Sequence, residues 1–155
     1  SKGDRMDYAI QKAVELGVAA ITPLYTEHGD VRLKGEREAK KLAHWQAVAV
    51  SACEQCGRAT VPEVKAPQSL SEWLGQRDEA LRLVLHPGTP GVLERAEHVA
   101  SACVLIGPEG GLSPREVEAA TAQGFAALTL GPRVLRTETA PVVALTLLQS
   151  RFGDM

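Results

Sequence analysis

Hydrophobic residues near the start of the chain recur at the spacing of a helix. Met6, Ile10 and Val14 fall on one face of such a helix, and Gly17 follows where a helix of this kind ends. Residues 18–24 form a short apolar run, which predicts a buried strand. The chain therefore opens with a helix followed by a strand.

A polar segment separates this strand from a longer helical pattern. Residues 26–35 are polar and predict a loop, and residues 36–56 predict a long amphipathic helix. Ser69 with Glu72 then matches a capping box, in which a hydroxyl and a carboxylate bind the first free amides of a helix. The apolar face expected for the long helix consists of Leu42, Trp45, Val48, Ala49, Ala52, Cys53 and Cys56.

The second half of the chain alternates between apolar runs and helix signals. The runs at 81–85, 103–106 and 125–130 predict strands. Residues 113–116 combine a serine cap, a proline and a glutamate, which is a strong helix start, and a last helix is expected from about residue 139. Alternating strands and helices predict an α/β fold, with a mostly parallel sheet flanked by helices.

Composition limits the class of protein. The chain has 155 residues, which we assign to one domain spanning 1–155, with 45% hydrophobic and 23% charged residues. A net charge of −2 is unusual for a self-sufficient nucleic-acid binder, so any such contact must come from a local basic patch or from another part of the protein. There is no membrane-spanning run and no signal peptide, and an odd number of cysteines favours a reducing cytoplasm.

The first of two glycine-bearing loops follows the strand at 103–106. Its sequence is Gly107-Pro108-Glu109-Gly110-Gly111. Open α/β sheets bind ligands at loops of this kind, where glycines let a ligand approach the backbone amides. A tight strand–helix turn without a ligand explains the glycines equally well. The loop matches neither a P-loop nor the dinucleotide fingerprint, so ATP hydrolysis and hydride transfer lack their usual sequence support.

The second glycine-bearing loop, between the last strand and the last helix, carries arginines, threonines and a glutamate. Arg133 and Arg136 lie beside leucines, and a planar guanidinium suits phosphate or carbonyl oxygens. Glu138 is either a base or a partner that orients an arginine. The plainer interpretation makes the arginines a solvated surface pair and gives Thr137 and Thr139 the role of helix caps.

Cysteine and histidine positions do not predict a metal site. Cys53 and Cys56 have the spacing of zinc and redox sites, but no second ligand pair accompanies them, and both fall on the apolar face of the long helix. Buried packing is therefore the favoured interpretation. His86 ends a strand and is a candidate to line a pocket, whereas no function is assigned to His28, His44 and His98.

The two long motifs, taken together, resemble one family. They read Ile106-Gly-Pro-Glu-Gly-Gly-Leu-Ser and Leu130-Gly-Pro-Arg-Val-Leu-Arg-Thr-Glu-Thr-Ala. The chain resembles the RsmE-type ribosomal RNA uridine-N3 methyltransferases of the SPOUT class. The resemblance extends over essentially the whole chain, with further matches at residues 11–18, 54–58, 85–87 and 149–154.

The resemblance implies a fold and a cofactor. The fold is an α/β domain with a deep C-terminal trefoil knot, an exception to the rule that chains do not thread. The cofactor is S-adenosylmethionine (SAM), held by three loops. The cofactor-binding residues that the resemblance implies are Leu85, His86, Pro87, Ile106, Gly107, Pro108, Glu109, Gly110, Gly111, Leu130, Gly131, Leu135, Thr139 and Ala140.

The resemblance also implies partners and a reaction. Members act as homodimers and methylate N3 of a uridine in the 16S ribosomal RNA of the small ribosomal subunit. Arg136 or Arg133 is expected to stabilise negative charge on the uracil, with Glu138 as the candidate base. Gln55, Arg58 and Arg133 are expected to contact RNA.

The chain departs from the family in one respect, because members carry an N-terminal β-barrel RNA-binding domain resembling a PUA domain. We expect that domain to be missing from this chain, which would account for its abrupt start and fit its weakly acidic charge. Two other functions remain open. One is a SPOUT enzyme that methylates a ribose 2′-hydroxyl or another base, and the other is a non-catalytic RNA-binding or ribosome-assembly factor.

Overall fold

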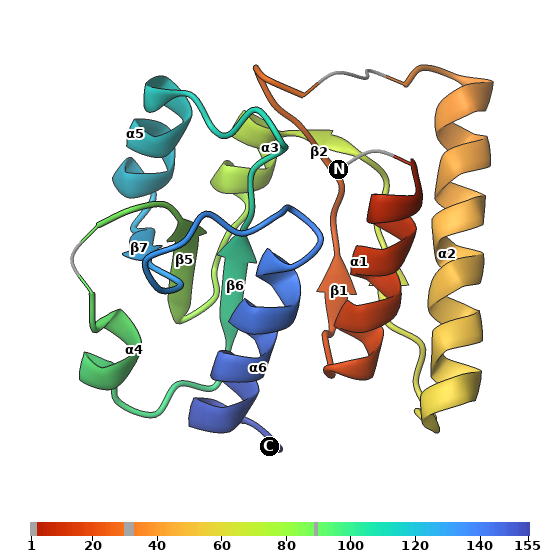
Figure 1. Cartoon of the computed structure of the whole chain (residues 1–155). Helices are drawn as coiled ribbons and strands as arrows, with labels where there is room; N and C mark the ends of the chain where they lie inside the picture. The colour runs from red at the N-terminus through yellow and green to blue at the C-terminus, as the bar shows by residue number, and fades with distance from the viewer. Residues whose placement is uncertain (1–2, 30–32, 89) are drawn as a thin grey trace.

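Short parallel strands alternate with helices along the chain, as the sequence predicts (Figure 1). The computed structural model describes residues 3–29, 33–88 and 90–155. The helices are α1 Gly3–Glu15, α2 Glu36–Cys56, α3 Leu70–Gly75, α4 Val92–Arg95, α5 Pro114–Ala122 and α6 Ala140–Phe152. The strands are β1 Ala20–Ile21, β2 Leu24–Tyr25, β3 Glu63–Val64, β4 Gln68–Ser69, β5 Leu81–Leu85, β6 Ala102–Leu105 and β7 Ala126–Leu128.

A three-stranded parallel sheet with the order β6-β5-β7 forms the second half of the chain. Successive side chains of a strand point to opposite faces of the sheet, and on the central strand β5 both faces are buried. Leu83 packs with Ala144 of α6 on one face, and Val84 packs with Ala120 of α5 on the other. Helices therefore cover both faces, which is the usual arrangement of a parallel sheet and confirms the predicted α/β class.

The apolar run at 18–24 was expected to form one strand, and this prediction is only partly right. The structure has two short strands, β1 and β2, on either side of Thr22 and Pro23. The first pairs in parallel with β3 and the second with β4. Proline has no amide hydrogen to donate to a ladder, so Pro23 marks the point where the chain leaves one strand partner for the other.

Helices α1 and α2 pack against each other through an apolar cluster. Ile10 and Val14 of α1 meet Trp45 and Ala49 of α2, and all four are buried. The far end of α1 also contacts α6, where the Gln149 side-chain amide donates to the Leu16 carbonyl oxygen at 2.8 Å. Helix α1 is thus fixed from two sides (Figure 1).

The long helix α2 has the predicted bounds, but one residue of its predicted apolar face is exposed. Cys53 is buried as expected, whereas Cys56 is exposed, so the prediction of buried packing is wrong for Cys56. Cys56 is the last residue of the helix, and Gly57 follows in the left-handed conformation with a φ of 82°. The helix ends there, and the apolar core on its buried face already stops one turn earlier, at Cys53.

Helix α5 begins at the capping box that the sequence predicts. The Ser113 hydroxyl accepts from the Glu116 amide at 3.2 Å, and the Glu116 carboxylate accepts from the Ser113 amide at 2.9 Å. The second Glu116 oxygen accepts from the Glu27 amide at 3.0 Å, and Glu116 is only 8% exposed. A buried carboxylate therefore joins the start of α5 to the loop after β2.

The C-terminal part differs in detail from the sequence expectations. The last strand is shorter than the predicted run at 125–130, since Phe125 packs with Trp73 before β7 begins. The last helix starts at Ala140, but the Thr139 side chain makes no capping hydrogen bond, so the helix-cap interpretation is wrong for this residue. The trefoil knot implied by the resemblance stays a prediction.

Candidate active site

Three loops gather at one edge of the β6-β5-β7 sheet. The strands are parallel, so the segments that follow them emerge on the same side. Leu85 ends β5, Ile106 follows β6, and Leu130 comes soon after β7. The segment between β7 and α6 crosses in front of β5 and β6 before α6 begins (Figure 1). The structure thus brings together the three segments that the resemblance assigns to the cofactor.

The loop after β5 is bound to the end of β7 by backbone contacts. The His86 amide donates to the Leu128 carbonyl oxygen at 3.3 Å, and the Gly88 amide donates to the Thr129 hydroxyl at 3.2 Å. A Cβ atom on Gly88 would lie 2.7 Å from the Ala127 Cβ, which real side chains do not tolerate. Glycine is therefore required for the close approach of these two segments.

The first glycine loop makes a tight turn and keeps backbone amides free. The Gly111 amide donates to the Pro108 carbonyl oxygen at 2.8 Å, and Gly111 has a φ of +77°. Within the part of the chain that the structure describes, the amides of Gly107 and Gly110 donate no hydrogen bond. Gly107 is half-buried and Gly110 is exposed, so both amides are accessible and free to donate to a polar ligand. His28 Nδ1 lies 3.1 Å from the Gly110 carbonyl oxygen and braces the turn.

The second glycine loop also has free backbone amides, and it has open space beside its backbone. Gly131 has a φ of +75°, and no atom lies within 4 Å of the position that its Cβ would take. Between 130 and 135 no amide donates a hydrogen bond to another described residue. Leu130 and Leu135 are half-buried, whereas Val134 is fully exposed. Free amides beside apolar side chains suit a ligand with an apolar ring and polar edges.

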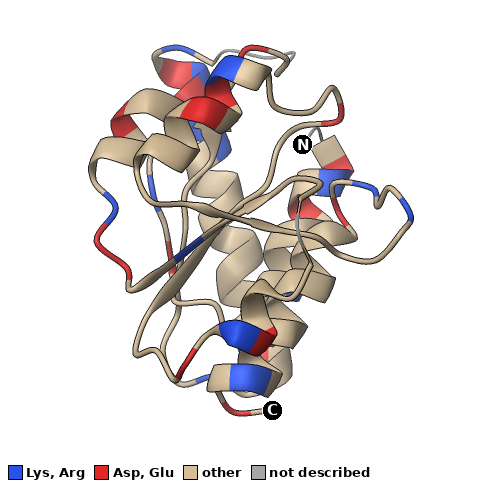
Figure 2. Cartoon of the chain, turned by 90° about the vertical axis from the view of Figure 1, so that its left-hand side faces the viewer, with Lys and Arg blue, Asp and Glu red and all other residues tan. Residues whose placement is uncertain are grey.

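Both arginines of this loop point into solvent. Arg133 and Arg136 are exposed, and neither guanidinium has a hydrogen-bond or ion-pair partner among the described residues. Basic positions, coloured blue, occur where the loop projects at the edge of the molecule (Figure 2). Unpaired guanidinium groups at the rim of a site are available to an incoming anion or carbonyl group.

Side chains connect the two glycine loops. The Glu109 carboxylate accepts from the Thr137 hydroxyl at 3.3 Å and from Arg5 Nη1 at 3.3 Å. Partial burial acts to raise the pKa of the Glu109 carboxyl, but hydrogen bonds from its own amide, Arg5 and Thr137 outweigh it and help hold that pKa below its ordinary value. Glu109 is therefore a carboxylate at neutral pH, which keeps both contacts ionic or charge-assisted.

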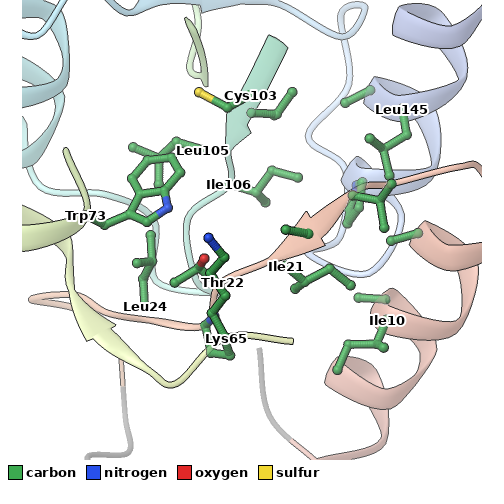
Figure 3. Close-up of a pocket in the computed structure, with 18 of the residues that line it drawn as sticks. Ile10, Ile21, Thr22, Leu24, Lys65, Trp73, Cys103, Leu105, Ile106 and Leu145 are labelled. Carbon is green, nitrogen blue, oxygen red and sulfur yellow. The ribbon is translucent and has the colours of Figure 1, made fainter. Parts of the chain in front are cut away.

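A large cavity lies beside these loops, between β6 and β1. Its volume is about 1160 Å³, and its walls are mostly apolar, including Ile10, Ile21, Leu105 and Leu145 (Figure 3). Of the three loops, residues 106–109 of the first glycine loop and Thr137 of the second line it. The segments at 85–87 and 130–135 lie outside the cavity. The free amides of the loops, rather than this apolar interior, supply the polar contacts that a nucleoside needs.

Residues 1–149 match a family model described as an RNA methyltransferase domain. The chain belongs to this family. It is 42% identical over 157 residues to the ribosomal RNA small subunit methyltransferase E of Buchnera aphidicola (subspecies Schizaphis graminum), which covers 100% of the chain. The protein of that name from Bacillus subtilis is 34% identical over 155 residues and covers 94% of the chain and 60% of its own length.

Solved structures of similar proteins share the fold. A methyltransferase of Legionella pneumophila in complex with SAM superposes with a TM-score of 0.95 and 44% identity, over 99% of this chain and 64% of that one. The ribosomal RNA small subunit methyltransferase E of Neisseria gonorrhoeae, bound to SAM, gives 0.91 and 41% over the same shares. The chain also spans 64% of the length of the Buchnera protein.

The two residues that were expected to contact RNA near the end of α2 lie in different surroundings. Gln55 is exposed. Arg58 is half-buried, and its Nη1 donates to the carbonyl oxygens of Val14 and Val18, each at 3.0 Å. Arg58 thus binds one carbonyl in the last turn of α1, where a cation is favourable, and one just after the helix, and its contact with RNA stays a prediction.

Two contributors to the site of this RNA methyltransferase domain were missed from sequence. Arg5 lies on α1, and Thr137 was expected only as a cap, yet both bind Glu109. Only Thr137 had a sequence signal, since it falls inside the second glycine loop, beside the arginines. No group of three or more His, Cys, Asp or Glu side chains among the described residues is placed to hold a metal, and no described helix is long and apolar enough to cross a membrane.

The three cysteines should differ sharply in reactivity. Burial, together with the neighbouring Glu79 carboxylate, raises the pKa of the Cys103 thiol to about 12, so roughly one in 10⁴ of these thiols is ionised at pH 8. Cys53 is buried and Cys56 is exposed. We expect iodoacetamide at pH 8 to modify Cys56 alone in the folded protein, as measured by peptide mass spectrometry.

Two further measurements complete this test. Modification of Cys103 should accelerate as the pH is raised toward 12, because a raised pKa shifts formation of the reactive thiolate to higher pH. In denaturant all three cysteines should react. Rapid labelling of Cys103 in the folded protein at pH 8 would contradict the raised pKa of this half-buried thiol.

Proposed function

We propose that this chain is the catalytic domain of a SAM-dependent methyltransferase that methylates N3 of a uridine in small-subunit ribosomal RNA. The observation that carries the proposal is the likeness to two SAM-bound structures, with TM-scores of 0.95 and 0.91 at 44% and 41% identity. The substrate comes from the name of the curated relatives, ribosomal RNA small subunit methyltransferase E. The homodimer implied by the resemblance and the cytoplasmic location favoured by the cysteine count belong to the same proposal.

The three loops fit SAM in chemical terms. Free amides at Gly107, Gly110 and Gly131 offer donors to the adenine and ribose, and the half-buried Leu130 and Leu135 offer apolar surface to the ring. The open space beside Gly131 leaves room for a ligand against the backbone. Bound SAM supplies a methyl group that is already activated by its positively charged sulfur.

The residues of the chain then have two tasks. Uridine N3 carries a proton at neutral pH, so it becomes a nucleophile only after that proton leaves. In our proposal the Glu138 carboxylate takes the proton from N3, and Arg136 stabilises the negative charge that develops on the uracil O2 and O4 atoms. The free electron pair of N3 would form the new bond to the methyl carbon as the bond between that carbon and the sulfur breaks, so that neutral S-adenosylhomocysteine would leave and the proton would remain on Glu138. Arg133, at the rim, binds the RNA backbone.

Isothermal titration calorimetry with SAM tests the cofactor part of this proposal. We expect one molecule of SAM to bind per chain, and we expect the Gly131→Val variant to lose binding. A side chain at Gly131 would fill the open space and would also force a β-branched residue into a positive φ. The matched control is Gly57→Val, which has a similar φ of +82° and open surroundings at the far end of α2. A folded wild-type protein that binds no SAM would overturn the proposal.

A further inference from the structure

Helix α1 sends one side chain to the junction of the two glycine loops. Arg5 Nη1 lies 3.3 Å from Glu109 Oε1 in the first loop, and Arg5 Nε lies 3.9 Å from Glu138 Oε2 in the second. The exposed fractions of the three side chains are 48%, 31% and 18%, so Glu138 is the most enclosed. One guanidinium therefore faces carboxylates from both loops.

Glu138 depends on this contact. Its Oε2 atom is buried and accepts no hydrogen bond from any described residue. A carboxylate oxygen removed from water is costly unless a cation compensates it. The arginines of its own loop, Arg133 and Arg136, form no ion pair among the described residues, so the only cation that the described contacts give Glu138 is Arg5.

The support under Arg5 is rigid. The next two turns of α1 place Ile10 and Val14 in the core, where they are 1% and 0% exposed. Thr137 binds the same Glu109 oxygen as Arg5, so the contacts run without a break from α1 through the first loop to the second. The position of the second loop is thereby tied to the core packing of α1 and α2.

We propose that Arg5 is a positioning residue, whose guanidinium joins the two glycine loops and fixes the Glu138 carboxylate where the reaction takes place. The joining of the loops is independent of the reaction. The consequence for catalysis rests on the proposed function, in which Glu138 takes the proton from uridine N3.

The first test needs no ligand. Hydrogen–deuterium exchange of the free protein should be about two- to fivefold faster at Gly111 and Thr139, whose amides are hydrogen-bonded within the two loops, in Arg5→Ala than in wild type, in keeping with partly exposed ion pairs. Glu109→Gln should accelerate exchange at the same two amides. The matched control is Lys12→Ala, which removes another α1 ion pair, the 2.8 Å contact with Glu15, and should leave both loops unchanged.

The second test separates positioning from stability. We expect Arg5→Ala to lower kcat by about tenfold, with little change in KM for RNA or in Tm, because misplacement of a reacting group slows the chemical step. Arg5→Lys keeps the charge but not the planar fork, so it should restore kcat only in part. A variant that merely weakened the fold would lower Tm and would not be rescued in this way.

The two proposals fail in different ways. Unchanged exchange in both loops of a folded Arg5→Ala protein would overturn the role of Arg5, whatever the wild type does with RNA. If exchange rises but a SAM-binding wild type transfers no methyl group to RNA, the joining of the loops stands and the proposed function fails. If the wild type is active and Arg5→Ala has wild-type kcat, the catalytic part of the inference is wrong.

Discussion

Replacing Arg136 with alanine should abolish most methyl transfer while leaving SAM binding intact. The Arg136 guanidinium is exposed and has no partner among the described residues, so its removal disturbs no described contact. In the proposed reaction it stabilises charge that exists only once N3 is deprotonated. Loss of one such donor costs about 10²–10³-fold in rate. The measurement is single-turnover methylation of small-subunit ribosomal RNA, beside calorimetry with SAM.

Arg37→Ala is the matched control for this experiment. Arg37 is another exposed arginine, in the first turn of α2, and it has no described partner. Its loss should leave the single-turnover rate near wild type. If Arg136→Ala reacted as fast as wild type with normal SAM binding, the electrostatic role of Arg136 would be wrong. If SAM binding fell instead, Arg136 would belong to the cofactor site.

Replacing Glu116 with alanine should have the largest effect on stability among the single polar changes considered. The Glu116 carboxylate binds the amides of Ser113 and Glu27, and the side chain is buried. Its removal leaves two enclosed amides without an acceptor, at a cost of about 1–3 kcal/mol for an unsatisfied group of this kind. We expect the free energy of unfolding to fall by about 2–3 kcal/mol, measured by urea denaturation.

Glu118→Ala serves as the comparison, because Glu118 is exposed on the same helix. Its free energy of unfolding should stay within about 0.5 kcal/mol of wild type. Glu116→Gln keeps one acceptor oxygen and should fall between wild type and Glu116→Ala. Equal stability of the Glu116→Ala and Glu118→Ala proteins would show that the link between α5 and the loop after β2 contributes nothing.

Features that depend on neighbouring residues in sequence could be predicted well. The bounds of α2 and the capping box at Ser113 follow from apolar spacing and from local hydrogen bonding, and both are confirmed. The parallel sheet follows from the alternation of strands and helices. Because the strands are parallel, the three loops that follow them are expected at one edge of the sheet, even without knowledge of any contact. The break at Pro23 had a sequence signal too, but the apolar run around it outweighed that signal.

Contacts between distant segments could not be predicted. Nothing local to Arg5 indicates that α1 reaches Glu109, because the register of α1 against the loops depends on packing with α2 and α6. In the same way, Arg58 was expected to contact RNA, since the sequence does not reveal that the end of α1 lies within reach of its guanidinium. Cys56 falls on the apolar stripe of α2, yet the core stops one turn earlier.

Mass mapping of small-subunit ribosomal RNA from cells with and without this protein tests the central claim most directly. We expect one uridine to lose a single base methyl group in the cells that lack the protein, and expression of the wild type to restore it. Expression of Arg136→Ala should not. An unchanged set of uridine modifications in cells lacking the protein would contradict the proposed function, and loss of a ribose methyl group instead would assign the enzyme a different target atom.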